Sequence, residues 1–424
     1  MEKEFIKKNY QDYILKPVMS PLNVVRGEGV FLIDDQGNKN LDMVSGFGVC
    51  ALGYHSSENN IVKKAILEQM DKIGHSPYYL GYIDAPARLA NKLREKSPVS
   101  VEKIFFCNSG SEAIEGAIRV VCKATGCYEL IAPQQSFFGR TNGAANLTGL
   151  SQDKQGVPLL PGVHHIPAPY CFRCSLGHSF PNCKLACAEY LEDVIEYGTK
   201  KEIAALFIEP VLGDVGVIVP PDEYFEKIVS ICNKHGILLV VDETLTGLGR
   251  TGKMFACEHW GLKPDVIVMG KALGGGLPLG AFMVSRKIAE TFSSKDFSSS
   301  VGGNTMACAG GNATINVIED LDLCQHVEKV GNYLISGLKE LKNKHDLIGE
   351  VRGLGLLIGV EIVDPSTKSA MPKEAERIKE ELLKKNILVT VYGKSTIRLT
   401  PALNIKEEEV DLFLRTFDET LSFF

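Results

Sequence analysis

The sequence has no run of about 20 apolar residues, the length that a membrane-spanning helix needs. Its first residues, Met1 to Lys8, include several charged side chains and lack the apolar core of a secretory signal. The sequence also has only a small excess of acidic over basic residues, because 46 Lys and Arg against 52 Asp and Glu leave a net charge of −6. We therefore expect no membrane partner, no nucleic-acid partner and a cytoplasmic location in which the twelve cysteines stay reduced.

The chain also lacks internal repeats and low-complexity linkers, so its 424 residues are expected to form an enzyme of about two domains. Strand-like and helix-like segments alternate from about Ser56 to Ala309. They begin with an amphipathic helix from Glu58 to Ile73 that Ser56 or Ser57 would cap. This alternation predicts the α/β class, with a large, mostly parallel sheet over residues 56–309.

The last part of the chain has a different pattern. Leucines and valines at helical spacing from Leu323 to Leu341 predict a long helix, and a charged helix should run from Glu374 to Lys385. Strands are predicted at residues 356–362, 387–391 and 396–399. Residues 310–424 should thus form a smaller α+β C-terminal domain, and residues 1–55 should be the N-terminal segment of that same small domain.

A lysine, Lys271, follows a strand-like apolar run and stands just before the glycines Gly274, Gly275 and Gly276. An amine attacks an aldehyde only when it is neutral, so a catalytic lysine needs a lowered pKa and room to move. Glycines leave that room beside the backbone. On its own, the pattern favours a lysine in a surface loop.

Two carboxylates end strand-like runs upstream of Lys271. The apolar run from Gly236 to Val241 ends at Asp242, and the run from Ala204 to Ile208 ends at Glu209. Continuous apolar runs are typical of buried parallel strands, and open α/β sheets bind ligands at the carboxyl ends of such strands. Each acid alone could be an ordinary turn or capping residue. Two such acids, with a lysine 29 residues after the second (271 − 242), favour a shared site.

A third segment predicts an anion site. Residues 103–107 have the pattern of a strand, residues 108–111 of a turn and residues 112–120 of a helix. The free N–H groups at a helix start, reached through Gly110 and flanked by the hydroxyls of Ser109 and Ser111, suit a phosphate group. The plainer alternative is a helix that one of these serines caps.

A competing motif, Gly247 to Gly252, matches the G-x-G-x-x-G pattern of dinucleotide-binding enzymes, which are a different class. That fingerprint requires its glycines at a strand-to-helix turn and an acid about 20 residues later. Here the first glycine comes five residues after Asp242, residues 253–257 would have to open a helix, and the next acid is Glu258. We therefore disfavour a nicotinamide enzyme.

Four cysteines lie close together in the sequence, at Cys171, Cys174, Cys183 and Cys187. Paired cysteines a few residues apart are the pattern of a structural zinc site with four thiolates. The spacing C-x2-C-x8-C-x3-C is not a common finger spacing, however, and Schiff-base chemistry needs no metal. Reduced thiols that pack an insertion are the favoured interpretation, and a structural metal is the alternative.

Taken together, these segments resemble the class III aminotransferases, pyridoxal-phosphate enzymes of fold type I that include ornithine, acetylornithine and 4-aminobutyrate aminotransferases. The resemblance covers nearly the whole chain through ordered motifs at residues 29–37, 108–113, 138–141, 208–211, 242–252, the Lys271 segment, 302–304 and 398–401. It implies transfer of an amino group from an amino acid or ω-amino acid to a 2-oxo acid, such as 2-oxoglutarate or pyruvate. These small molecules would be the partners, together with a second copy of the chain in a homodimer or a dimer of dimers.

The resemblance also implies which residues act on the cofactor, pyridoxal 5′-phosphate. Lys271 would form the aldimine and move the substrate proton. Asp242 would keep the pyridine nitrogen protonated so that the ring accepts electrons, and Glu209 would support this network. The other cofactor contacts would come from Ser109, Gly110, Ser111, Phe137 and the partner subunit's Ser300.

For the substrate, the resemblance implies that Arg398 binds the α-carboxylate and that Arg140 binds a second carboxylate when there is one. Asp214 stands where a glutamate often pairs with the carboxylate arginine in ω-aminotransferases, and it is one methylene shorter. Further departures from the family pattern make the pocket more apolar: Leu212 and Leu245 replace glutamines, and Phe138 and Phe297 replace histidines.

Relatives with this layout also include amino-acid racemases, 2-epimerases and a branch of dialkylglycine decarboxylases. Residues 169–187 look similar to a segment of archaeal and bacterial members that include racemases as well as ornithine-type aminotransferases. An aminotransferase is the favoured interpretation. A racemase or 2-epimerase of the same fold is the alternative, and a decarboxylase is favoured less.

Overall fold

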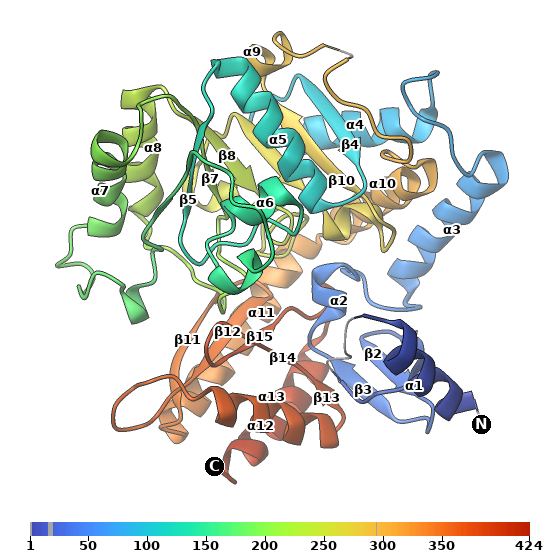
Figure 1. Ribbon diagram of the computed structural model, residues 1–424. Coiled ribbons are helices and arrows are strands. Elements are labelled where there is room, and N and C mark those ends of the chain that lie inside the picture. The colour runs from blue at the N-terminus through green and yellow to red at the C-terminus, as the bar shows by residue number, and fades with distance from the viewer. Residues whose placement is uncertain (1, 16–19, 294) are drawn as a thin grey trace.

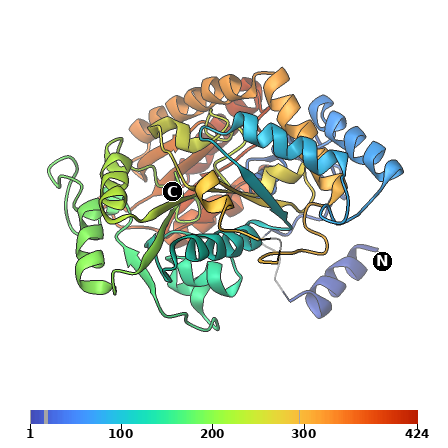
Figure 2. The ribbon, with the colours of Figure 1, turned by 90° about the horizontal axis from the view of Figure 1, so that it is seen from above.

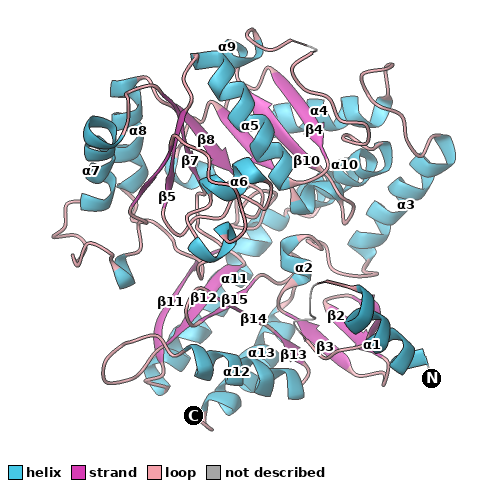
Figure 3. Cartoon of the chain, in the orientation of Figure 1, coloured by secondary structure: helices cyan, strands magenta, loops and turns pink. Residues whose placement is uncertain are grey.

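A computed structural model describes residues 2–15, 20–293 and 295–424 of the chain. Met1 and residues 16–19 of the predicted N-terminal segment lie outside the described residues. A large domain built on one wide sheet lies above two smaller sheets in Figure 1, and Figure 3 separates the helices from the strands in the same view. None of the helices in the described ranges is long and apolar enough to cross a membrane.

The large sheet has the strand order β4-β10-β9-β8-β7-β5-β6. Its strands are β4 Lys103–Cys107, β5 Glu129–Pro133, β6 Val163–Ile166, β7 Ile203–Ile208, β8 Leu238–Asp242, β9 Val266–Met269 and β10 Gly280–Val284. Only β10 runs antiparallel to its neighbours, β4 and β9. The strands β7 and β8 are parallel and buried along their whole length, so the prediction of a mostly parallel α/β sheet is confirmed.

Helices cover both faces of this sheet, as the view from above shows (Figure 2). One face carries α5 Gly110–Thr125, and the other carries α4 Asp84–Lys96 and α10 Thr305–Asp320, against which α3 Ser57–Lys72 packs. The remaining helices of this domain are α6 Asn142–Leu147, α7 Ala186–Asp193, α8 Tyr224–His235 and α9 Arg286–Ala289. Short 3-10 and π turns lie at Ser151–Lys154, Cys171–Arg173, Val194–Gly198, Ala256–Trp260 and Lys271–Gly274.

Serine caps begin two of these helices where the sequence predicts them. The hydroxyl of Ser56 accepts a hydrogen bond from the amide of Asn59 (3.0 Å) at the start of α3. At α5 the hydroxyl of Ser109 accepts one from the amide of Glu112 (3.2 Å). Because each cap satisfies an N–H that has no partner within the helix, it fixes where the helix begins.

Two four-stranded sheets form the smaller part. The first is antiparallel, with β11 Ile348–Leu354, β12 Leu357–Ile362, β15 Thr396–Leu399 and β14 Thr390–Tyr392 in that order. The second has β1 Val24–Glu28, β2 Phe31–Asp34, β3 Lys39–Asp42 and β13 Ile387–Leu388. The parallel pairing of β13 with β3 joins the two ends of the chain. It supports our proposal that residues 1–55 and the C-terminal region form one small domain.

The structure differs from the sequence predictions at two places. The strand predicted at residues 387–391 is split, because β13 joins one small sheet and β14 joins the other. The predicted boundary at residue 309 falls inside α10, which packs against α3 and α4. We therefore place the proposed boundary after Asp320, ahead of the helices α11 Leu323–Lys344, α12 Pro372–Lys384 and α13 Glu407–Leu421. The N-terminal region carries α1 Glu2–Tyr13 and α2 Ser45–Gly48.

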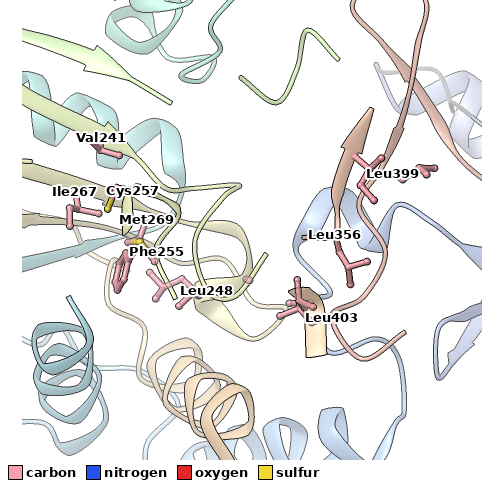
Figure 4. Packing of buried hydrophobic residues seen from close by; sticks show 14 of the residues in the cluster. Val241, Leu248, Phe255, Cys257, Ile267, Met269, Leu356, Leu399 and Leu403 are labelled. Atoms are coloured by element: carbon pink, nitrogen blue, oxygen red, sulfur yellow. The ribbon is translucent and has the colours of Figure 1, made fainter. Parts of the chain in front are cut away.

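Buried apolar residues from both domains belong to one cluster, and Figure 4 shows part of it. Val241 of β8 and Met269 of β9 belong to the large sheet, and Leu356 and Leu399 belong to the small domain. Arg250 adds polar contacts between the domains, because it donates hydrogen bonds to the carbonyls of Leu356 (3.2 Å) and Pro401. The two domains are thus held together beside the carboxyl ends of β7, β8 and β9.

Candidate active site

A cavity of about 400 Å³ lies at the carboxyl ends of the parallel strands. It brings together most of the predicted site residues from segments that are far apart in the sequence. Its wall includes Ser109, Gly110, Ser111, Phe137, Glu209, Asp214, Asp242 and Lys271. This placement is the one that open α/β folds give to their ligands.

Lys271 begins the short turn that follows β9. Its backbone has φ 44°, in the left-handed region that side chains other than glycine rarely adopt. Burial lowers the pKa of Lys271, while the nearby carboxylates of Asp214 and Asp242 oppose that shift. A buried amine with a lowered pKa is a better nucleophile near neutral pH than an ordinary lysine.

Asp242 is the last residue of β8 and is buried. Its Oδ1 accepts a hydrogen bond from the amide of Thr244 (2.8 Å), and burial raises the pKa of its carboxyl group. A buried carboxylate is costly unless a cation or a hydrogen-bond donor faces it. Because Asp242 lines the cavity, a protonated ring nitrogen would be such a partner.

Glu209 at the end of β7 connects two cavity loops. Its Oε1 accepts a hydrogen bond from the amide of Phe137 (2.8 Å), and its Oε2 accepts one from the amide of Gly213 (3.2 Å). Burial raises the pKa of Glu209 to about 8, and the nearby carboxylate of Asp242 acts in the same direction. The contacts of Glu209 are therefore with the backbone that carries the aromatic ring of Phe137 and with the loop that carries Asp214.

The start of α5 forms the other end of the cavity. The first amides of a helix have no partner within the helix, and Gly110 and Ser111 line the cavity at this point. The hydroxyl of Ser111 accepts a hydrogen bond from the amide of Arg140 (3.1 Å). A side chain at Gly110 would place its Cβ 2.9 Å from Cγ2 of Thr244, so this tight corner needs a glycine. Free amides in such a corner suit a phosphate group.

Arg398 of β15 lies behind the cavity wall and is 1% exposed. Its Nη1 donates hydrogen bonds to Oδ1 of Asp214 (2.6 Å) and to the carbonyl of Gly213 (3.3 Å). The ring of Tyr392 stacks on the guanidinium, with 3.5 Å from Cζ to the ring centroid. Arg398, the arginine predicted to bind the substrate carboxylate, is thus paired with Asp214. Asp214 lies between Arg398 and the cavity, because it lines the cavity itself.

Two of the residues predicted to contact substrate or cofactor, Arg140 and Ser300, lie away from the cavity of this single chain. The side chain of Arg140 is 70% exposed and pairs with Asp153 (2.9 Å). Ser300 is exposed, and its carbonyl lies 2.8 Å from Nε2 of His75. Neither of them lines the cavity.

Other cavity residues were missed by sequence reasoning. Thr244 and Thr246 line the wall, and their position directly after Asp242-Glu243 was an available signal. Nothing in the sequence pattern pointed to Tyr392, which stacks on Arg398 and is not part of the cavity wall. Among the departures from the family pattern, Leu245 and Phe138 both line the cavity, and both are buried. Phe297 packs in an aromatic group with Phe105 and Phe282.

The glycine-rich segment Gly247 to Gly252 does not form a dinucleotide fingerprint. It is a turn that is followed by the 3-10 turn Ala256–Trp260, with no α-helix opening at residues 253–257. Since the fingerprint needs a helix N-terminus directly after its glycines, this segment has no anion site of that kind.

The four clustered cysteines, Cys171, Cys174, Cys183 and Cys187, line one small hollow, and all four are free thiols. Within residues 2–15, 20–293 and 295–424, no three His, Cys, Asp or Glu side chains are arranged to hold a metal ion.

Comparison with known proteins agrees with this geometry. Residues 14–421 match the model of the aminotransferase class-III family. The leucine/methionine racemase of Thermococcus litoralis is 37% identical over 97% of this chain and 94% of that protein. The acetylornithine aminotransferase of Methanopyrus kandleri is 34% identical over 95% of this chain and 94% of that protein.

A solved structure of the omega transaminase from Pseudomonas jessenii in complex with PMP superposes with a TM-score of 0.92 at 29% identity. The alignment covers 98% of this chain and 97% of that one. The predictions of fold type I, of an aminotransferase and of pyridoxal phosphate as cofactor are confirmed. The chain belongs to the class III aminotransferase family.

Proposed function

We propose that this enzyme transfers the amino group of a carboxylate-bearing donor to a 2-oxo acid in the Lys271 cavity. The observation that carries this proposal is the position of Arg398. Its buried guanidinium lies behind Asp214, next to the cavity that Lys271 and Asp242 line. A planar guanidinium can bind a carboxylate through two parallel hydrogen bonds, so it would hold an amino acid or a 2-oxo acid in one orientation.

The residues present fit pyridoxal phosphate. Gly110 and Ser111, with Ser109 as the helix cap, offer the amide corner for its phosphate, and Phe137 lies in the wall where a ring would stack. Gly139 keeps this wall close to α5, because a Cβ there would come 2.2 Å from Oγ of Ser111. When bound, the cofactor supplies an electron sink for the bond that the substrate breaks.

The protein's own groups would then divide the work. Lys271 would hold the cofactor covalently, and its neutral Nζ would be the base that takes the proton from the substrate Cα and the acid that returns it. Asp242 would keep a positive charge on the ring nitrogen of the bound cofactor. Glu209 holds the Phe137 and Gly213 backbones, so it acts as a positioning residue. Asp214 must leave Arg398 before a substrate carboxylate can bind there.

Substitutions of the two arginines test the proposed substrate contacts. Loss of a charge-assisted fork costs about 1.5–3 kcal/mol, or roughly tenfold to over a hundredfold in affinity. We expect Arg398→Ala to raise KM for every carboxylate substrate by that factor. Arg140→Ala should raise KM for a dicarboxylate such as 2-oxoglutarate and leave pyruvate nearly unchanged, since pyruvate has no second carboxylate.

The control for this pair is Arg88→Ala. Arg88 is a surface arginine that pairs with Asp84 of its own helix, so its loss should leave both KM values unchanged. Equal KM values for 2-oxoglutarate in the wild type and in Arg140→Ala would remove Arg140 from the substrate site.

A racemase is the second candidate, and one observation favours it. The leucine/methionine racemase of Thermococcus litoralis shares 37% identity with this chain over nearly its full length. A racemase anchors one carboxylate and needs no acceptor, so Arg140 would have no role. Incubation of the holoenzyme with single enantiomers of leucine, methionine and ornithine, with and without 2-oxoglutarate or pyruvate, separates the two. Inversion without any 2-oxo acid would favour the racemase.

We also propose a homodimer, and a cytoplasmic location in which the twelve cysteines stay free. The segment around Tyr79 supports the dimer, because large apolar side chains are exposed there beside Ser300. Leu80 is 75% exposed and Val301 is 54% exposed, and the hydroxyl of Tyr79 donates a hydrogen bond to the carbonyl of Ser299 (3.2 Å). A second copy packed on this surface would cover the apolar side chains and bring Ser300 to its partner's phosphate site.

The dimer is tested by Leu80→Asp, which places a charge in the proposed interface. We expect the sedimentation coefficient to fall toward that of a monomer and the bound cofactor to be lost in parallel, because each phosphate site would lose a contact from the other chain. Leu159→Asp, at an exposed apolar residue on another loop, is the control. A monomeric Leu80→Asp protein with full cofactor and full activity would contradict the proposal.

A further inference from the structure

The loop at residues 213–217 carries Asp214 and lies against the antiparallel sheet of the small domain. Its backbone bends tightly, with Gly216 at φ 104° and Val217 at φ 61°. On the sheet beneath it, a Cβ at Gly359 would come 2.5 Å from the carbonyl oxygen of Gly216. A glycine at position 359 is therefore what allows this loop to press onto β12.

Two arginines flank that glycine across three strands. Arg352 of β11 is paired with Gly359, and Gly359 is paired with Arg398 of β15. Residues directly opposite each other in an antiparallel sheet place their side chains on the same face. Arg352 and Arg398 therefore stand on either side of Gly359, and the 213–217 loop lies between them.

Arg352 binds the end of this loop that is farther from Arg398, at Gly216 and Val217. Its Nε donates to the carbonyls of Gly216 (3.0 Å) and Val217 (2.9 Å), and its Nη2 donates to Gly216 (2.7 Å) and to Oγ1 of Thr396 (3.2 Å). Arg398 holds the near half through Asp214 and Gly213.

The guanidinium of Arg352 is itself fixed in place. Its Nη1 lies 2.6 Å from Oε2 of Glu361 and donates to Glu350 (2.6 Å), and it stacks on the ring of Tyr170 with 4.9 Å from Cζ to the centroid. The Arg352 side chain is 9% exposed and Glu361 is 2% exposed. A guanidinium held on three sides can fix the position of the loop carbonyls that it binds.

The geometry points to Arg352 as a positioning residue that sets how readily Asp214 gives up Arg398 to a substrate carboxylate. The inference rests on the proposed function of Arg398 as the carboxylate site. Asp214 and a substrate carboxylate compete for the guanidinium of Arg398. Any contact that holds the Asp214 loop in place therefore favours the state in which Asp214 is paired with Arg398. By releasing the loop at Gly216 and Val217, loss of Arg352 would shift the population toward an uncovered Arg398.

The experiment is a double-mutant cycle on the holoenzyme, with 4-methylpentanoate as a carboxylate probe that has no amine. Isothermal titration calorimetry measures its Kd for the wild type, Arg352→Gln, Asp214→Ala and the double variant. We expect Arg352→Gln to tighten binding by roughly threefold or more, the size of a coupled contact. In the Asp214→Ala background, Arg352→Gln should leave Kd unchanged, because the competing carboxylate is already gone.

Arg173→Gln is the matched control, because Arg173 also pairs with Glu361 but, among the residues that the structure describes, makes no hydrogen bond to the 213–217 loop. It should leave Kd unchanged. Arg352→Lys keeps a cation beside Glu361 but lacks the planar fork, so it should tighten binding in the same direction and serves if the glutamine variant unfolds.

An unchanged Kd in folded Arg352→Gln or Arg352→Lys overturns the inference. So does equal tightening with and without Asp214. A different result would contradict the proposed function itself: an Arg398→Ala variant that binds the probe as tightly as the wild type does would show that Arg398 is not the carboxylate site.

Discussion

Lys271→Ala is expected to reduce turnover by roughly 10²–10⁴-fold or more, the range lost when a positioned proton-transfer group is removed. Lys271 stands at the end of β9 on the cavity wall, and burial lowers the pKa of its amine. It is the one lysine in that wall among the residues that the structure describes. Turnover of donor and acceptor by the purified variant, with cofactor in excess, measures the loss.

The attachment of the cofactor gives a second measurement on the same residue. Borohydride treatment of the wild type, followed by peptide mass spectrometry, should find the reduced cofactor on Lys271. Lys263→Ala is the control, because Lys263 is an exposed lysine that donates to the carbonyl of Pro98. A reduced cofactor on another lysine, or a Lys271→Ala variant with normal turnover, would show that the site is assigned to the wrong residue.

Asp242→Asn is expected to lower kcat by at least about a hundredfold. The substitution keeps the size of the side chain and an oxygen for the amide of Thr244, but it removes the charge that would hold a proton on the ring nitrogen. A charge-assisted hydrogen bond contributes about 1.5–3 kcal/mol, so its loss alone accounts for roughly tenfold to over a hundredfold in rate. The weakened electron sink adds to this loss. The chemical shift of ¹⁵N in the ring of labelled cofactor should move to that of an unprotonated pyridine.

Glu243→Gln provides a matched control for Asp242→Asn. Glu243 follows Asp242 and is buried, but its carboxylate contacts Oγ1 of Thr246 (2.5 Å) and the amide of Cys257 (2.7 Å) and does not line the cavity. Its substitution should lower the melting temperature and leave the ¹⁵N shift of the cofactor unchanged. If both variants lose the protonated ring nitrogen, Asp242 has no specific role.

The sequence by itself determined the elements that depend on local patterns. The apolar runs before Glu209 and Asp242 are β7 and β8, because a strand buried on both faces needs apolar side chains at successive positions. The caps at Ser56 and Ser109 could be predicted for the same kind of reason, since each is a contact with a residue three positions away. The carboxyl ends of parallel strands lie at the same edge of a sheet. The sequence could therefore predict that Glu209, Asp242 and Lys271, which follow such strands, lie close together.

Only the tertiary structure decided the arrangement of the substrate arginines. Arg398 and Asp214 are 184 residues apart, and although the family resemblance pointed to this pair, no local pattern indicates that Asp214 covers a buried guanidinium. The same holds for the contact of Arg352 with Gly216 across 136 residues, and for the division of residues 387–391 between two sheets. Strand propensity can be read from neighbouring residues, but the partner of a strand or of a guanidinium depends on which distant segments pack beside it. That packing is what makes Arg398 buried and leaves Arg140 at the surface.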